Sequence, residues 1–180
     1  MNLSIGHLLL FLMACTVSLL AQSSDSAQRE AMKKLRWWVG EWRGEAWTST
    51  GPGRRDTTTM VETIRMELDG TIIIVEGLGQ KKMQQMQHGE TAHHAFAVIS
   101  YDDKKASYRW HSWRVPGGLY NETEPIVSDQ SFRWSMETPR GKIRYTATLN
   151  AKGQWEETGE FSVDGQTWRP FFGMLLNRVE

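Results

Sequence analysis

Short clusters of turn-forming residues recur at hairpin spacing through most of the chain, and this recurrence constrains the fold more than any other feature. Glycine, proline, asparagine and aspartate favour tight turns because their backbones accept the required dihedral angles or their side chains bond the turn. The clusters lie at 51–53, 69–70, 102–105, 116–118, 128–130, 139–141, 150–153 and 164–165. The runs between them are rich in threonine, isoleucine, valine and aromatic residues, which favour strands. The sequence therefore predicts a series of antiparallel hairpins.

We expect ten strands, near 41–49, 57–68, 71–79, 92–101, 107–115, 119–127, 131–138, 142–149, 154–163 and 167–179. Apolar and polar side chains alternate in 131–138 and 142–149, as in a sheet with one buried face. Sequential antiparallel strands can close as an up-and-down barrel, which has no unpaired edge and encloses a cavity when it has more than about eight strands. We predict an all-β, up-and-down barrel, with a two-sheet sandwich as the main alternative.

The first 21 residues have the pattern of an export signal. Apolar runs occupy 8–14 and 17–21, and no lysine, arginine, aspartate or glutamate precedes Asp25. The run is too short to span a membrane, and Ala21 offers a cleavage point. We predict a signal peptide over 1–21, a linker and short helix over 22–34, and a barrel domain over 35–180. The protein is then periplasmic or extracellular, and its mature part has no transmembrane segment.

Cysteine and charge exclude several classes of function. The single cysteine, Cys15, lies within the predicted leader, so the mature domain has no thiol for a disulfide, a nucleophile or a thiolate metal site. Residues 12–15 loosely resemble a bacterial lipobox, which leaves lipid anchoring through Cys15 as a minor alternative. Lysine and arginine total 21, as do aspartate and glutamate, so there is no basic excess to bind nucleic acid. The sequence does not indicate an oligomeric state.

The segment 35–45 carries a Gly-x-Trp element, Gly40-Glu41-Trp42, that resembles the start of calycin barrels. In that group the tryptophan closes one end of the barrel, and in lipocalins an arginine from the far end of the chain covers it. The resemblance implies an end seal formed by Trp42 and Arg178, with a cation over an aromatic face contributing roughly 0.5–2 kcal/mol. This role is structural.

The chain from Leu35 to Val179 resembles exported bacterial lipocalin-like proteins that are classed as a domain of unknown function. The similar runs are 74–77, 94–102, 108–109 and 168–174. More distantly the pattern is similar to fatty-acid-binding proteins and to nitrobindin, which holds haem through a late histidine. No histidine follows His111 in this chain. The haem function is therefore not carried over, and no cofactor is predicted.

Nine tryptophans, six phenylalanines and four tyrosines must fill either a core or a pocket wall. Polar residues that share a strand face with apolar ones are candidates for a ligand site, because a buried charge needs a partner. We expect a partly apolar small molecule, with its polar or anionic head at Arg109 and no covalent chemistry. The candidate ligand-binding residues are Met60, Glu62, Glu76, His94, Phe96, Arg109, Trp110, His111 and Trp113.

Three alternatives to a binding protein remain at this stage. Glu76 and His94 would be the acid–base pair of an enzyme if they touch in the cavity, although no nucleophile elbow, phosphate loop or dinucleotide motif is present. The polar residues would otherwise form only an internal network in a structural or interaction module. A metal site would combine histidines with Glu76 or Glu90, but none has a recognised spacing, and we predict none. These histidines are His88, His93, His94 and His111.

Overall fold

The computed structural model describes residues 27–81 and 90–179, and its strands form one antiparallel sheet. The predicted leader, Cys15, the helix-capping residues Asp25 and Ser26, and His88 lie outside the described residues. The elements are η1 (Arg36–Trp38), β1 (Gly40–Gly51), β2 (Arg54–Glu67), η2 (Leu68–Gly70), β3 (Ile72–Lys81), β4 (Thr91–Asp102), β5 (Ser107–Val115), β6 (Leu119–Thr123), β7 (Ile126–Ser128), β8 (Ser131–Thr138), β9 (Gly141–Leu149), β10 (Trp155–Ser162) and β11 (Arg169–Arg178). The prediction of an all-β fold of antiparallel hairpins is confirmed.

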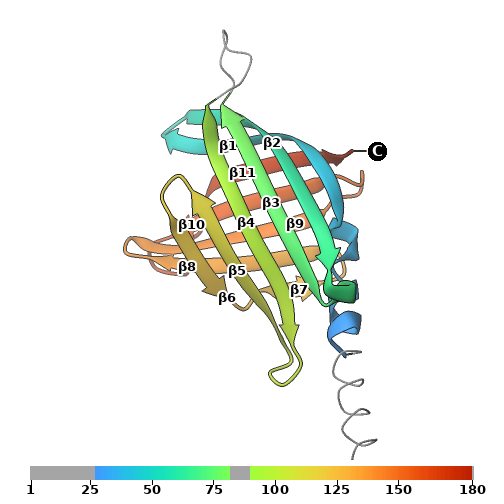
Figure 1. Cartoon of the computed structure of the whole chain (residues 1–180). Coiled ribbons are helices and arrows are strands. Elements are labelled where there is room, and N and C mark those ends of the chain that lie inside the picture. The colour runs from blue at the N-terminus through green and yellow to red at the C-terminus, as the bar shows by residue number, and fades with distance from the viewer. Residues whose placement is uncertain (1–26, 82–89, 180) are drawn as a thin grey trace, which may run out of the picture.

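The sheet is a half-barrel with its two edges brought together (Figure 1). Its strand order is β6-β5-β4-β3-β2-β1-β11-β10-β9-β8-β7, so β6 and β7 are the two edge strands. Residues of β6 approach β8 across the gap between the edges. All the paired strands belong to this one sheet, so within the described residues the two-sheet sandwich is excluded.

The predicted strand at 119–127 is wrong, and it accounts for the count of ten instead of eleven. The chain forms β6 and then β7, with Glu124 and Pro125 between them. Proline has no N–H to donate to a ladder, so pairing stops there. The chain crosses at this point from one edge of the sheet to the other. The fully closed ladder is therefore also wrong for the described part of the chain, and we call the junction between β6 and β7–β8 the seam.

Residues 27–33 form the predicted short helix, at one end of the half-barrel (Figure 1). Met32 and Leu35 are fully buried in the core, and the Tyr108 hydroxyl donates a hydrogen bond to the Ala31 carbonyl at 2.7 Å. The helix is thus fixed to β5 and covers this end of the sheet. No helix in residues 27–81 or 90–179 has the length and apolar character needed to cross a membrane.

Trp42 and Arg178 meet at the same end of the half-barrel. Trp42 is fully buried on β1, and its indole N–H donates to the Trp38 carbonyl at 2.8 Å. The Arg178 guanidinium lies 4.1 Å from the centre of the Trp42 ring and donates to the carbonyls of Trp37 and Val39. The last strand is therefore bound to the segment that precedes the first one, and the indole is covered by a cation.

Aromatic rings extend from this seal along the interior and across the seam. Trp155 makes edge contacts with Trp42 and Trp38, at centroid distances of 6.0 and 4.9 Å. Further along, Trp110 of β5 contacts Phe132 and Trp134 of β8, at 5.2 and 5.0 Å. Since β5 and β8 lie on opposite arms of the sheet, these rings join the arms by packing.

Candidate functional site

The half-barrel contains a cavity of about 540 Å³. Its inner end is lined by the buried side chains of Trp38, Trp110 and Trp155. Its rim includes Thr48 and Arg114, which are exposed. A volume of this size falls in the range of small-molecule sites, which are concave and mostly apolar with a few polar groups.

Small side chains on β4 leave room for this cavity, and glycines on β3 leave room for the β2 side chains that line it. The inward face of β4 carries Ala95 and Ala97, which line the cavity, and the facing part of β3 carries Gly77 and Gly79. A Cβ at Gly77 would overlap the Glu62 carboxyl, and one at Gly79 would lie 2.6 Å from the Met60 sulfur. The large side chains of β2 therefore occupy space that glycines of the neighbouring strand leave free.

Two carboxyl groups line the inner part of the cavity. Glu62 of β2 and Glu157 of β10 are only 6% and 7% exposed, and within the described residues neither forms a salt bridge. Burial raises the pKa of Glu157 to about 8. Burial and the nearby Glu157 carboxyl raise the pKa of Glu62 well above its usual value. At neutral pH Glu157 therefore holds a proton that a surface glutamate would lose.

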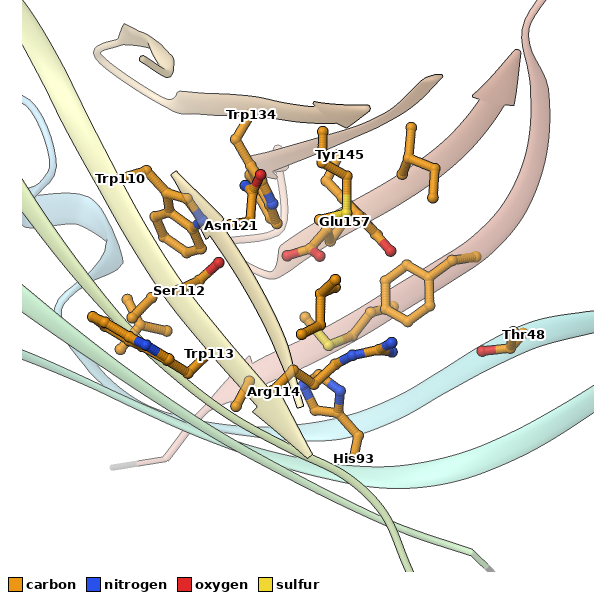
Figure 2. Close-up of a pocket in the computed structure, with 18 of the residues that line it drawn as sticks. Thr48, His93, Trp110, Ser112, Trp113, Arg114, Asn121, Trp134, Tyr145 and Glu157 are labelled. Atoms are coloured by element: carbon orange, nitrogen blue, oxygen red, sulfur yellow. The ribbon is translucent and has the colours of Figure 1, made fainter. Parts of the chain in front are cut away.

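A tyrosine lies beside this carboxyl pair. Figure 2 shows Tyr145 next to Glu157 in the cavity wall. Burial and the Glu157 charge raise the pKa of Tyr145 to about 12, so its hydroxyl stays protonated at neutral pH. The Trp134 ring stacks on Tyr145 at a centroid distance of 5.0 Å. The inner part of the cavity thus combines aromatic faces with carboxyl and hydroxyl groups.

The rim carries the positive charge of the site. Arg114 of β5 and His93 of β4 lie side by side and point into the cavity (Figure 2). Burial, the Arg114 guanidinium and His94 lower the pKa of His93 to about 4, so this imidazole is neutral at pH 7. Arg114 forms no salt bridge with the described residues. The unpaired Arg114 guanidinium therefore lies at the entrance of the cavity. It could form hydrogen bonds with an anionic group of a ligand there.

Three of the predicted binding residues line the cavity from inside. Met60 and Glu62 do so from β2, and Trp110 does so from β5. On β2 the alternation of large apolar and polar side chains identified the inward face correctly.

The predicted positions of Glu76 and His94 are wrong, because both side chains lie on the outer face of the sheet. Glu76 accepts a hydrogen bond from Arg65 at 2.6 Å and is about half exposed. His94 is exposed and follows His93, which points inward, so it must point outward. The two do not form an acid–base pair in the cavity, and the enzyme hypothesis loses the residues on which it depended.

Arg109 and His111 are also outside the cavity, on the outer face of β5. Arg109 forms an ion pair with Glu124 at 2.8 Å, and the His111 Nδ1 lies 3.1 Å from the Tyr120 hydroxyl. The expected anion-binding role of Arg109 is therefore wrong: it is already paired, and Arg114 is the arginine that faces the cavity.

Phe96 and Trp113 pack mainly against each other and Tyr120 on the outer face. Their ring centroids are 6.1 Å apart, and Trp113 lies 5.4 Å from Tyr120. Trp113 is 45% exposed and lies on the other side of β5 from Trp110, although it borders the cavity near the seam (Figure 2). Phe96 does not line the cavity, contrary to our expectation.

Sequence reasoning missed several residues that line the cavity. These are His93, Arg114, Asn121, Trp134, Tyr145, Trp155 and Glu157. Glu157 follows the exposed Glu156, but Trp155, Glu157 and Gly159 share a buried face of β10. Within residues 27–81 and 90–179, no group of three or more histidine, cysteine, aspartate or glutamate side chains is arranged to hold a metal ion.

Together these features define an antiparallel half-barrel with an aromatic cavity that is acidic inside and basic at the rim. No protein-family model matches the chain, and no curated protein matches it either. Among solved structures, that of Rv2717c from M. tuberculosis is similar, with a TM-score of 0.60 at 10% sequence identity. The alignment covers 83% of this chain and 98% of that one. At this identity the likeness shows a shared fold alone.

Proposed function

We propose that this protein binds a partly apolar small molecule in the cavity of its half-barrel and carries out no covalent chemistry on it. The observation that carries the proposal is the cavity of about 540 Å³, which is bordered on β4 by the small side chains of Ala95 and Ala97. A fold that needed only a core would fill such a space, since protein interiors pack closely and each void costs stability.

The chemistry of the lining supports a ligand with an apolar body and a polar head. Aromatic rings such as Trp110 and Trp134 supply flat apolar contact, and Arg114 supplies an unpaired cation at the rim. An anionic head would therefore meet Arg114, with the apolar body inside. The resemblance of the sequence to exported lipocalin-like domains agrees with a binding role outside the cytoplasm.

Protein purified from its own host is expected to release a small molecule on denaturation, as measured by native and denaturing mass spectrometry. Ala95→Phe places a ring in the cavity, because Ala95 lines it, and should abolish this co-purification. The matched control is Ala151→Phe in the exposed turn between β9 and β10, which should retain the ligand. Equal retention by both variants would contradict the proposal.

Arg114→Gln is expected to weaken binding of the anionic apolar dye 8-anilinonaphthalene-1-sulfonate by about tenfold, or about 1.4 kcal/mol. The reason is loss of the only cation that lines the cavity among the described residues. Fluorescence titration measures the affinity, and near-ultraviolet circular dichroism checks that the variant is folded. Arg109→Gln, on the outer face, is the control and should bind the dye like the wild type. An unchanged affinity in Arg114→Gln would show that the head does not lie at the rim.

A further inference from the structure

The inner end of the cavity has buried carboxyls that lack a cationic partner among the described residues. Glu62 of β2 and Glu157 of β10 line the cavity from either side of the β1–β11 pair, and both are more than nine-tenths buried. Neither has a cationic partner in the described part of the chain. A buried carboxyl normally has such a partner, because removing its charge from water is costly.

A second observation at the same end also indicates a missing partner. The indole N–H groups of Trp38 and Trp110 are buried and have no hydrogen-bond acceptor among the described residues. Both side chains line the cavity and are almost fully buried. Buried polar atoms are nearly always hydrogen-bonded in folded proteins, and these two groups are donors, so they indicate an occupant that also carries a hydrogen-bond acceptor.

We propose that this inner end is a subsite for a protonated amine, with Glu62 and Glu157 accepting hydrogen bonds from the ammonium group. This proposal rests on the proposed binding function and adds the chemical class of ligand. A compact ammonium has three donors, which suits two carboxyls that line one cavity from different strands. The rings of Trp38, Trp110 and Trp155 border the same space, and aromatic faces attract cations.

Other occupants fit this end less well. A metal ion would find only two carboxyls, since the described residues provide no larger group of metal-binding side chains around them. An anion would be repelled as soon as either carboxyl ionised, and the cationic group that would hold it, Arg114, is at the rim. The room for the Glu62 carboxyl is itself kept free by Gly77, where any Cβ would overlap it.

Binding an amine here must release protons. The charged and titratable groups that line the cavity are Glu62 from β2, His93 from β4, Arg114 and Tyr120 from β5 and β6, Glu137 from β8, Tyr145 from β9 and Glu157 from β10. The Glu157 carboxyl is largely protonated at neutral pH and burial also raises the pKa of Glu62, whereas the complex needs at least one carboxylate. Amine binding is therefore expected to strengthen as pH rises from 6.5 to 8 and to release about one proton.

The test compares three probes of one shape by calorimetry at pH 7.5: phenethylamine, phenethyl alcohol and 3-phenylpropionate. We expect phenethylamine to bind at least tenfold more tightly than the alcohol. Its binding heat should differ between phosphate and Tris buffers because protons are released. Glu62→Gln and Glu157→Gln should each weaken amine binding tenfold or more and change alcohol binding less than about threefold. Glu76→Gln, a glutamate of the outer face, is the matched control and should change neither.

Equal affinities for amine and alcohol in the wild type would overturn the subsite, as would amine binding that survives both inner substitutions. The carboxyl pair would then be an internal hydrated network. Binding of the dye and the alcohol without a preference for the amine overturns this subsite alone. Failure of every probe, including the dye, overturns the proposed function and the subsite with it.

Discussion

Glu157→Gln is expected to stabilise the protein at pH 8 by about 4 kcal/mol. In the folded protein burial raises the pKa of Glu157 to about 8, whereas in the unfolded chain it has its usual value near 4.5. Between these values the folded state binds more protons than the unfolded state, so the free energy of unfolding falls as pH rises. Each pKa unit corresponds to about 1.4 kcal/mol. Glutamine has a similar shape and is never charged, so the free energy of unfolding of the variant does not fall for this reason as pH rises.

The measurement is urea denaturation of wild type and variant from pH 5 to 8. His93 acts in the opposite direction, because its lowered pKa makes stability rise between about pH 4 and 6.5. The interval from pH 6.5 to 8 therefore isolates the carboxyls, and there the wild-type curve should fall more steeply than that of the variant. Glu156→Gln is the matched control, since Glu156 is the exposed neighbour on the same strand. Parallel curves for wild type and Glu157→Gln would contradict the raised pKa.

Trp42→Ala is expected to destabilise the protein by about 3–5 kcal/mol, the usual cost of removing a fully buried aromatic side chain. The substitution removes the ring contact with Trp155, the hydrogen bond to the Trp38 carbonyl and the surface on which Arg178 lies. Urea denaturation followed by far-ultraviolet circular dichroism measures the change.

Trp113→Ala serves as the comparison, because Trp113 is half exposed on the outer face and contacts Phe96 and Tyr120 there. Its loss should cost about 1 kcal/mol or less. If both substitutions destabilised the protein equally, the contacts of Trp42 in the end seal would contribute no more to stability than those of Trp113 on the outer face.

Turn chemistry and strand positions were predictable from the sequence because they depend on local preferences. The strand at 107–115 and that at 131–138 have the predicted bounds, and the turns at 51–53 and 69–70 fall between paired strands. The predicted strand 119–127 is two strands because Pro125 has no N–H to donate to a ladder, and the prediction did not include this effect. Its consequence is not local, since the break places the two edges of the sheet there.

The inward faces of β3 and β4 were assigned wrongly for one physical reason. We expected large apolar residues to point inward, but where a wall borders a cavity the inward side chains are small and the outer face carries the larger ones. Gly77 and Ala95 face inward, while Leu78 and Phe96 face outward. The alternating pairs Gly77-x-Gly79 and Ala95-x-Ala97 are the sequence signal that would have located the cavity wall.

The contacts across the seam determine how much the circumference of the half-barrel can vary. Ladder hydrogen bonds have fixed lengths and directions, so a barrel closed by them has a fixed circumference. Here Trp110 meets Phe132 and Trp134 through ring faces and edges. Such contacts are weakly directional, each contributing about 0.5–1.5 kcal/mol beyond burial, so the rings can slide over one another without breaking any backbone pairing. The circumference of the described sheet can therefore change at the seam without the loss of a ladder hydrogen bond.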